Sequence, residues 1–575
     1  MNKSRKQKVN VMLSLFIAVS IGSSLAVMSN NSQQNVYAAE KIEGNFAKTS
    51  KVIYEDISIA NPNNYEEIAD SLNEATNGVT EVIIELNNSY TEELNRPTDP
   101  NISMAEVKEI IREQRANVKA YYKESNQRMA DALELESYYD NYRIDSYAPF
   151  IFAEIEGSVE KSDVQNIDKL AQSNQISTIY IKSIERTVNP EINNAVNAIY
   201  GTTTVSNPAV DGSGVVIGIL DTGIIDSNNP NFEGTSITRR TEWWFNETVR
   251  EHSTAVASVA GGVYGLAPGA TILSVEVSGE PSGEIEWMLD RDVNIINMSY
   301  YMGTNYGNYT SDSAYCDHIA RNNYVMFVGS SGNRGKDDAL VTSPNGYNML
   351  TIGSCGNNGV VSQFSSWKEN FNINFPNLVA PGEDYYIPNM GSGLWSGTSF
   401  SAPLTSGSLA LLMQRTPIYA TYPEVVMALV MATTTRRDEY SSMAGFHDQA
   451  GAGMLNLEKM MNSRHNTVPF TVTEDAVKTF VSEKTIRLYA GQRLQVAFVS
   501  LVNNQKNVNT NNVTDYDLYL YNSSDEPVVA SAGTHNNEYI DYTVTTSGYY
   551  TIKIRQFSAK KTTLMDCCAY AYSIS

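Results

Sequence analysis

The chain has 575 residues, with 41 Lys or Arg against 64 Asp or Glu, so its formal charge is −23. Its 42% apolar and 18% charged content excludes a wholly disordered or fibrous protein. The acidic balance argues against nucleic acid and anionic membranes as main partners, because phosphate groups are bound by basic patches.

The first 39 residues have the order of a bacterial secretory signal. A basic start without acids precedes an apolar stretch from Val11 to Met28, and the small-residue site Val36-Tyr37-Ala38 follows. We therefore expect a cleaved signal of the Gram-positive type, an extracellular protein, and no stable membrane insertion after cleavage. An uncleaved anchor is the alternative, since the apolar stretch approaches about 20 residues.

The region 40–195 is expected to combine a long helix with a small β-α-β unit. Ser103-x-x-Glu106 is typical of a capping box and predicts a helix that runs toward about Glu136. Strands are expected at 147–155 and 176–181, with a helix at 162–173 between them. No motif with obvious chemistry lies in this unit.

The region 196–465 alternates short apolar runs with glycine-rich turns and helical stretches. Runs at 214–220, 271–277, 293–298 and 324–329 are mostly apolar and carry apolar residues on both faces. Such runs favour buried parallel strands, so we expect an α/β fold with a doubly wound, mostly parallel sheet flanked by helices.

The region 466–575 changes character and predicts an all-β sandwich. Strands are expected at 485–489, 494–502, 516–521, 539–544 and 550–554. The Asn-rich stretch 503–512 is expected to be a loop.

Three motifs in the central region carry groups suited to catalysis. Asp221 ends an apolar strand before a Thr-Gly turn, and His252 begins a helix of small residues. Ser399 follows a glycine at the start of an apolar helix, where free N–H groups and the positive dipole end gather. Pro403 is tolerated only in a first turn, so this helix should begin near Ser399.

Each motif also has an ordinary structural explanation: a turn, a hydrogen-bonded His at a helix start, and a capping Ser. Together they favour catalysis, because Asp, His, Ser is one of three chain orders known for the same catalytic geometry.

At this point the chain resembles the subtilisin-like serine proteases (subtilases) over about residues 205–460. The motifs that carry the resemblance are Asp221-Thr222-Gly223, His252 with Gly265-Leu266-Ala267-Pro268, Ser331-Gly332-Asn333-Arg334-Gly335, Leu378-Val379-Ala380-Pro381-Gly382, Gly397-Thr398-Ser399 with Ala402-Pro403, and Gly451-Ala452-Gly453-Met454-Leu455-Asn456. It implies a subtilisin-like fold and peptide-bond hydrolysis through an acyl-enzyme, with a protein or peptide as substrate.

The resemblance also assigns roles to residues. Ser399 would be the nucleophile, His252 the general base and Asp221 the group that orients it, with Asn333 as the oxyanion donor. The substrate would lie between Ser299-Tyr300-Tyr301 and Ser330-Ser331-Gly332. No metal or organic cofactor is expected in the chemistry.

Two positions depart from the family pattern. Ser253 follows the catalytic His, where the family usually has Gly, and we expect a slight repositioning there. Tyr301 ends the substrate-binding edge, where Gly is usual, and it should crowd a subsite. We therefore expect a narrower specificity than that of a general scavenging protease.

The flanking regions take their roles from the same resemblance. The expected division is a signal peptide at 1–39, a prodomain at 40–195, a protease domain at 196–465 and a C-terminal β-sandwich module at 466–575. The prodomain would cap the active site, assist folding and be cut off, by the enzyme itself, between about Lys182 and Asn207. A permanent N-terminal domain is the alternative.

Smaller features leave alternatives open. Asp515 and Asp517 lie on one face of an expected strand and could hold a structural Ca²⁺, although a solvated strand edge is the favoured interpretation. Cys316 and Cys355 could form a disulfide or remain buried thiols. Adjacent Cys567 and Cys568 should not pair with each other.

Three functions remain in competition at this stage. The first is an active secreted endopeptidase, either general or dedicated to maturing one protein or peptide. The second is a catalytically inactive relative that acts as a binding protein. The third makes the C-terminal module the functional part. The presence of Asp221, His252, Ser399 and Asn333 together favours the first.

Overall fold

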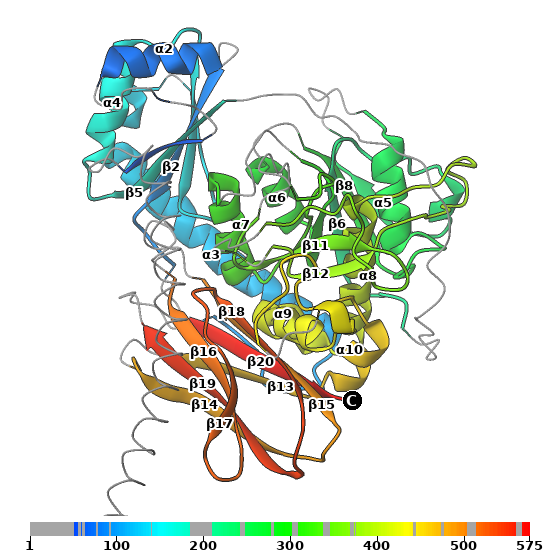
Figure 1. Cartoon of the computed structure of the whole chain (residues 1–575). Helices are drawn as coiled ribbons and strands as arrows, with labels where there is room; N and C mark the ends of the chain where they lie inside the picture. The colour runs from blue at the N-terminus through cyan, green and yellow to red at the C-terminus, as the bar shows by residue number, and fades with distance from the viewer. Residues whose placement is uncertain are drawn as a thin grey trace, which may run out of the picture.

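The computed structural model has a central α/β region with an N-terminal α+β unit on one side and a C-terminal all-β unit on another (Figure 1). It describes residues 51–575 except for 56–58, 60–63, 76–78, 91–93, 140, 184–209, 242–247, 278–280, 302–308, 337–344, 369–372, 374, 441–443, 473–475, 503–512 and 559–565. The expected signal at 1–39 and the expected loop at 503–512 lie outside the described residues.

The N-terminal unit contains a five-stranded sheet in the order β1-β5-β2-β4-β3. Its elements are β1 Val52–Glu55, α2 Tyr65–Ala75, β2 Val79–Leu86, α3 Met104–Ala132, a 3-10 turn Leu135–Ser137, β3 Tyr142–Ile144, β4 Phe150–Glu156, α4 Lys161–Ala171 and β5 Ile176–Ser183. The long helix was expected, and Ser103 and Glu106 form both hydrogen bonds of its capping box. The expected β-α-β unit is β4, α4 and β5.

One part of this sheet was not expected from the sequence. Strand β2 lies between β4 and β5 and pairs antiparallel with both. Its apolar pattern is interrupted by Glu81 and Glu85, which are nevertheless buried. Glu81 lies 3.4 Å from Lys182, and Glu85 accepts a hydrogen bond from Tyr180. Partners on β5 thus make a charged sequence compatible with a central strand.

The central region is built on a seven-stranded sheet in the order β12-β11-β10-β9-β6-β8-β7, parallel throughout. The strands are β6 Val216–Asp221, β7 Ile237–Arg239, β8 Thr271–Glu276, β9 Ile295–Met298, β10 Met326–Ser330, β11 Met349–Cys355 and β12 Leu378–Pro381. From β6 the chain builds first toward β7 and β8, then in the opposite direction. Asp221 therefore ends the strand at which the strand order reverses, where α/β sheets place their functional groups.

Helices cover both faces of this sheet. They are α5 Glu251–Gly261, α6 Ser282–Leu289, α7 Ser311–Asn323, α8 Thr398–Arg415, α9 Pro423–Ala432 and α10 Leu457–Ser463, with 3-10 turns at Pro230–Phe232, Pro417–Thr421 and Asp438–Tyr440. One apolar cluster joins α5, α8 and α9 to one face, and a second joins α6 and α7 to the other. The α/β expectation for this region is confirmed.

Pro403 corrects one detail of the sequence reasoning. Helix α8 begins at Thr398, so Pro403 lies in its second turn rather than its first. A proline there has no N–H to donate to the carbonyl of Ser399, four residues earlier. That carbonyl instead accepts a hydrogen bond of 3.0 Å from the Ser299 hydroxyl. The proline thus frees an acceptor beside the expected nucleophile.

The C-terminal unit contains two four-stranded antiparallel sheets, β13-β20-β15-β18 and β14-β19-β16-β17. The strands are β13 Thr467–Val472, β14 Thr479–Leu488, β15 Arg493–Leu501, β16 Asp515–Tyr521, β17 Pro527–Ser531, β18 Asn537–Thr543, β19 Gly548–Ser558 and β20 Asp566–Ile574. Phe498 from one sheet and Leu518 and Ile552 from the other share a single apolar cluster. Strands β13, β17 and β20 were not expected.

The C-terminal unit is not loosely attached. Ala569 and Ala571 of β20 and Val499 of β15 belong to the same apolar cluster as α9. Every residue of α9 is buried, because the helix lies between the central region and this sheet. The module and the central region therefore share a core.

All four cysteines are buried free thiols, so Cys316 and Cys355 do not form the disulfide that the sequence left open. Among the described residues, no helix is both long and apolar enough to cross a membrane.

Candidate active site

The centre of the site is a buried carboxylate–imidazole pair. Asp221 is fully buried at the end of β6, and His252 is the second residue of α5, 8% exposed. His252 Nδ1 lies 2.9 Å from Asp221 Oδ1. This geometry fixes the ring orientation and leaves the opposite ring nitrogen, Nε2, for a proton-transfer partner.

Asp221 Oδ1 accepts three further hydrogen bonds. They come from the Thr222 backbone N–H at 2.7 Å, the Thr222 hydroxyl at 3.2 Å and the Ser253 hydroxyl at 3.2 Å. Ser253 stands where the family usually has Gly, and its side chain thus contributes a donor to the carboxylate. Hydrogen bonds to the charged form favour an ionised carboxyl group in a buried site.

The pKa of His252 is raised above its ordinary value of 6.5. Burial acts as the largest single influence and lowers the pKa, because it penalises the imidazolium. The charge of Asp221 and its hydrogen bond act in the opposite direction and together outweigh burial. His252 is therefore a stronger base than a free imidazole.

Ser399 lies half-buried at the second position of α8. Its hydroxyl donates to the carbonyl of Ser299 at 3.4 Å, just beyond the end of β9. The two serines are thus tied to each other in both directions, since the Ser299 hydroxyl bonds the Ser399 carbonyl. Among the described hydrogen bonds none joins Ser399 to His252, a contact that often tightens only when substrate is bound.

Asn333 is held by its carbonyl oxygen. Asn333 Oδ1 accepts from the Thr398 backbone N–H and the Thr398 hydroxyl, each at 2.9 Å. The side-chain amide is then turned toward the start of α8. A Cβ at Gly397 would lie 3.2 Å from Asn333 Nδ2, and the φ of Gly397 is +154°. Glycine is therefore required where Asn333 approaches the helix end.

A small cavity of about 30 Å³ adjoins Ser399 and Asn333. This is enough room to hold water. Its described lining consists of Ser299, Tyr300, Tyr301, Ser330, Gly332, Asn333, Arg334, Thr398 and Ser399. Arg334 and Thr398 were not expected there, although Arg334 follows directly on the expected oxyanion donor. Ser331, expected in the wall, is fully buried and does not line the cavity.

Tyr300 lines the cavity, but most of the residue is buried. Its ring is 3% exposed and packs in the apolar cluster with α6 and α7, and its hydroxyl lies 3.8 Å from the sulfur of Met298. Tyr301 is half-buried. Both tyrosines line the cavity, and Tyr301, the more exposed of the two, is better placed to meet a bound substrate.

Comparison with known proteins identifies the family. The model of the subtilase family matches residues 212–453. The thermostable alkaline protease of Halalkalibacterium halodurans is 28% identical over 257 residues, which are 42% of this chain and 68% of that protein. The major intracellular serine protease of Bacillus subtilis is 30% identical over 234 residues, 35% of this chain and 69% of that protein.

This chain belongs to the subtilase family. It is accordingly a serine endopeptidase, whose substrates are proteins or peptides. Among solved structures, the prenylagaramide maturation protease PagA is 25% identical, with a TM-score of 0.36, covering 43% of this chain and 93% of that one. The subtilase match spans the seven strands of the central sheet and helices α5 to α9.

No group of three or more His, Cys, Asp or Glu side chains in the described part of the chain could hold a metal ion. At the pair considered for calcium, Asp517 accepts a hydrogen bond of 2.9 Å from Tyr519. Burial, with the neighbouring charge of Asp517, raises the pKa of Asp515 to about 7. A calcium ion at this position stays a prediction.

Proposed function

We propose that this subtilase is a secreted endopeptidase, made with a signal peptide and a prodomain, that processes itself and uses Asp221, His252 and Ser399 as its catalytic triad. The observation that carries the proposal is the buried 2.9 Å contact between Asp221 and His252 at the reversal point of the sheet. Ser399 is placed by the N-terminus of α8.

The proposed chemistry follows from these positions. His252 takes the proton of the Ser399 hydroxyl as its oxygen attacks the scissile carbonyl, and it returns that proton to the leaving amine. A water molecule, deprotonated by the same imidazole, then hydrolyses the ester and regenerates Ser399. Asp221 stabilises the imidazolium that forms in each step.

The oxyanion would be bound by two donors. The Ser399 backbone N–H lies in the first turn of α8 and has no intrahelical acceptor. The Asn333 amide is oriented by the two bonds that its oxygen accepts from Thr398. In subtilisin, a worked case of this fold, loss of such an Asn lowers turnover by about 10²–10³.

The test compares Ser399→Ala with Ser392→Ala, an exposed serine in the preceding loop. Residues 40–575 of each form are expressed, and their intact mass and hydrolysis of a peptide library are followed over time. Ser399→Ala should neither lose its N-terminal region nor hydrolyse peptides, whereas Ser392→Ala should match the wild type. Equal processing and hydrolysis by Ser399→Ala would contradict the assigned nucleophile.

A second candidate, a selective maturation protease, is favoured by the small cavity and by Tyr301 in its lining. A bulky ring at a position where the family pattern has Gly restricts the substrate side chain that can enter. We expect Tyr301→Gly to broaden the range of cleaved sequences in the same library. An unchanged cleavage profile would favour a general protease.

The domain division at 1–39, 40–195, 196–465 and 466–575 also belongs to this proposal. It is supported by the separate sheets of the N-terminal, central and C-terminal units.

A further inference from the structure

The N-terminal region reaches far beyond its own sheet. Residues 94–132, called the strap below, run along the central region and consist of an extended segment followed by helix α3. Figure 1 shows α3 passing from the N-terminal sheet beneath the central unit toward α9. The strap contacts α7 and the 3-10 turn before α9.

The far end of the strap is anchored by a buried ion pair. Arg96 pairs with Glu424 of α9, and their side chains are 12% and 1% exposed. The guanidinium also lies 4.8 Å from the ring centre of Tyr422. Tyr422 and Tyr324 donate hydrogen bonds of 3.0 Å to the carbonyls of Pro97 and Asn95. Removing Arg96 would leave a buried carboxylate uncompensated.

The middle of the strap supplies a second anchor. Arg115, 3% exposed, donates to the carbonyls of Leu289 at 3.3 Å, Val293 at 2.5 Å and Asn323 at 3.1 Å. Two of these carbonyls belong to the last residues of α6 and α7, and such carbonyls have no N–H donor within their own helices. The strap therefore completes the C-terminal ends of two helices of the protease core.

Apolar residues of α3 are part of that core. Val107 and Ile111 are 0% and 1% exposed and belong to the cluster that contains β6, α5 and α8. Val118 and Tyr122, both 0% exposed, belong to the cluster on the opposite face with α6 and α7. Withdrawal of the strap would expose both clusters to water.

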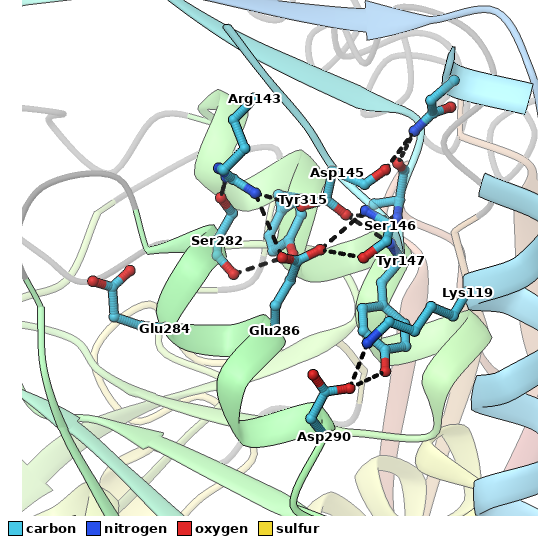
Figure 2. Close-up of polar contacts among 12 residues, drawn as sticks. Lys119, Arg143, Asp145, Ser146, Tyr147, Ser282, Glu284, Glu286, Asp290 and Tyr315 are labelled. Carbon is cyan, nitrogen blue, oxygen red and sulfur yellow. Dashed lines mark hydrogen bonds and ion pairs between the residues drawn. The ribbon is translucent and has the colours of Figure 1, made fainter. Parts of the chain in front are cut away.

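The N-terminal sheet and the adjoining part of α3 also contact the protease. Figure 2 shows Ser146 and Arg143 against Glu286 of α6, and Tyr147 with Lys119 against Asp290. Arg143 and Lys119 are more than a third exposed. Because these two cations are partly exposed, their ion pairs contribute little. Phe150 and Phe152 of β4, by contrast, are buried and pack edge-on against Tyr315 of α7, so the sheet adds apolar contacts to those of the strap.

We propose that the N-terminal fragment stays bound after processing and that the strap is a permanent structural segment of the mature enzyme. The interaction surface is formed by the C-terminal ends of α6 and α7 and by the start of α9 with the 3-10 turn before it. The partner on this surface is the enzyme's own severed N-terminal chain. The mature protease is then a two-chain molecule. The proposal rests on the proposed self-processing only for where the chain is cut. That cut is the hydrolysis of one peptide bond by one water molecule.

The test cuts the chain without relying on its own activity. A recognition sequence for a site-specific protease is inserted after Asn197 in Ser399→Ala, and the protein is cut, verified by intact mass and diluted to nanomolar concentration. Size-exclusion chromatography should show both fragments eluting together at the position of the uncut protein. Separate elution of a folded C-terminal fragment would overturn the proposal.

Variants test the anchors. Arg115→Met should weaken retention about 100-fold, because it strips buried helix-end carbonyls of a charged donor. The matched control is Arg128→Met, the same change at an exposed position of α3. Equal retention in both variants would show that the Arg115 anchor does not hold the fragment. If Arg115→Met fails to fold, co-elution of the two fragments of the cut Ser399→Ala protein, in which Arg115 is unchanged, still tests whether the fragment is retained.

The wild type separates this proposal from the proposed function. Protein that has matured by itself should contain the two chains at a one-to-one ratio by mass spectrometry. If the wild type does not process itself but the cut Ser399→Ala protein retains its fragment, self-processing fails and retention stands. If the matured enzyme keeps full activity and thermal stability after losing the fragment, retention is not structural.

Discussion

At the scale of single residues, Asp221 and its donors set the basicity of His252. Catalysis needs the neutral imidazole, and the pKa of His252 is raised. The acid limb of kcat/KM should therefore have its midpoint above pH 6.5, and Asp221→Asn should lower that midpoint and reduce kcat by about 10⁴. A pH profile on one good peptide substrate measures both.

Ser253 adds a prediction that the family pattern does not contain. Ser253→Ala removes one donor from Asp221, so the carboxylate binds His252 more strongly and the acid limb should shift upward by less than about one pH unit. Ser258→Ala, a buried serine of the same helix that bonds Thr254 instead, is the matched control. An acid limb that stays in place for both variants would mean that Ser253 only fills space.

Arg334 bears on specificity. It is the one charged residue among the nine that line the cavity beside Ser399. A cation in the lining should favour acidic over basic substrate side chains, and Arg334→Gln should lower kcat/KM at least about tenfold for acidic peptides relative to neutral ones. Lys336→Gln, at a nearby exposed cation, is the control.

The same reasoning applies to the processing bond. Between Lys182 and Asn207 the acids are Glu185 and Glu191. N-terminal sequencing of the matured enzyme should find a start at Arg186 or Ile192. A start after an apolar or basic residue would contradict an acidic preference.

At the scale of elements, the close packing of α5 against α8 depends on small residues. A Cβ at Gly407 would lie 2.8 Å from the carbonyl oxygen of Ala260. Gly407→Ala should therefore destabilise the protein by about 1–3 kcal/mol through overpacking. Gly283→Ala in α6, where a Cβ meets nothing within 4 Å, should be neutral or slightly stabilising. Denaturant unfolding of Ser399→Ala forms measures both changes.

Elements with one clear signal were predictable from the sequence. Apolar runs located β6, β8, β9 and β10, and the capping box located the start of α3. Strands β2 and β20 were not found, because the burial of Glu85 depends on a hydrogen bond from Tyr180 of β5 and because β20 is recognised only through its pairing with β13 and β15. Local pattern does not record partners that lie far away in the chain.

The residues of the site likewise fall into those that the sequence could predict and those that it could not. The order Asp221, His252, Ser399 was readable as motifs, since each has its own local signature. The hydroxyl contact of Ser253 with Asp221 and the place of Arg334 in the lining depend on how separate elements meet. Tyr301 could be recognised as a crowding residue only by comparison with the family, not from its own neighbours in the chain.

At the scale of the whole molecule, a partly buried carboxylate links the N-terminal sheet to the protease. Glu55 of β1 accepts hydrogen bonds from the backbone N–H and hydroxyl of Ser311 at the start of α7. Burial raises its pKa to about 7, Lys182 lowers it and Asp312 raises it. Tyr180 of β5 also faces this group. The carboxyl group therefore takes up a proton when the sheet docks.

The sign of the pH dependence follows. A folded pKa raised from about 4.5 to about 7 gives stability that is fully present below the unfolded pKa and is lost as pH rises through 7. The Tm of Ser399→Ala should fall between pH 5 and pH 7.5. Adding Glu55→Gln, which cannot ionise, should flatten that fall, whereas Glu67→Gln on the exposed face of α2 should not.

The nucleophile assignment is tested most directly by covalent labelling with a fluorophosphonate, which needs no knowledge of the substrate. The matured enzyme should gain one adduct, located on Ser399 by peptide mass mapping, and His252→Ala should lose the labelling with its general base. An adduct on another serine, or no adduct on an enzyme that still hydrolyses peptides, would contradict the catalytic triad proposed for this protein.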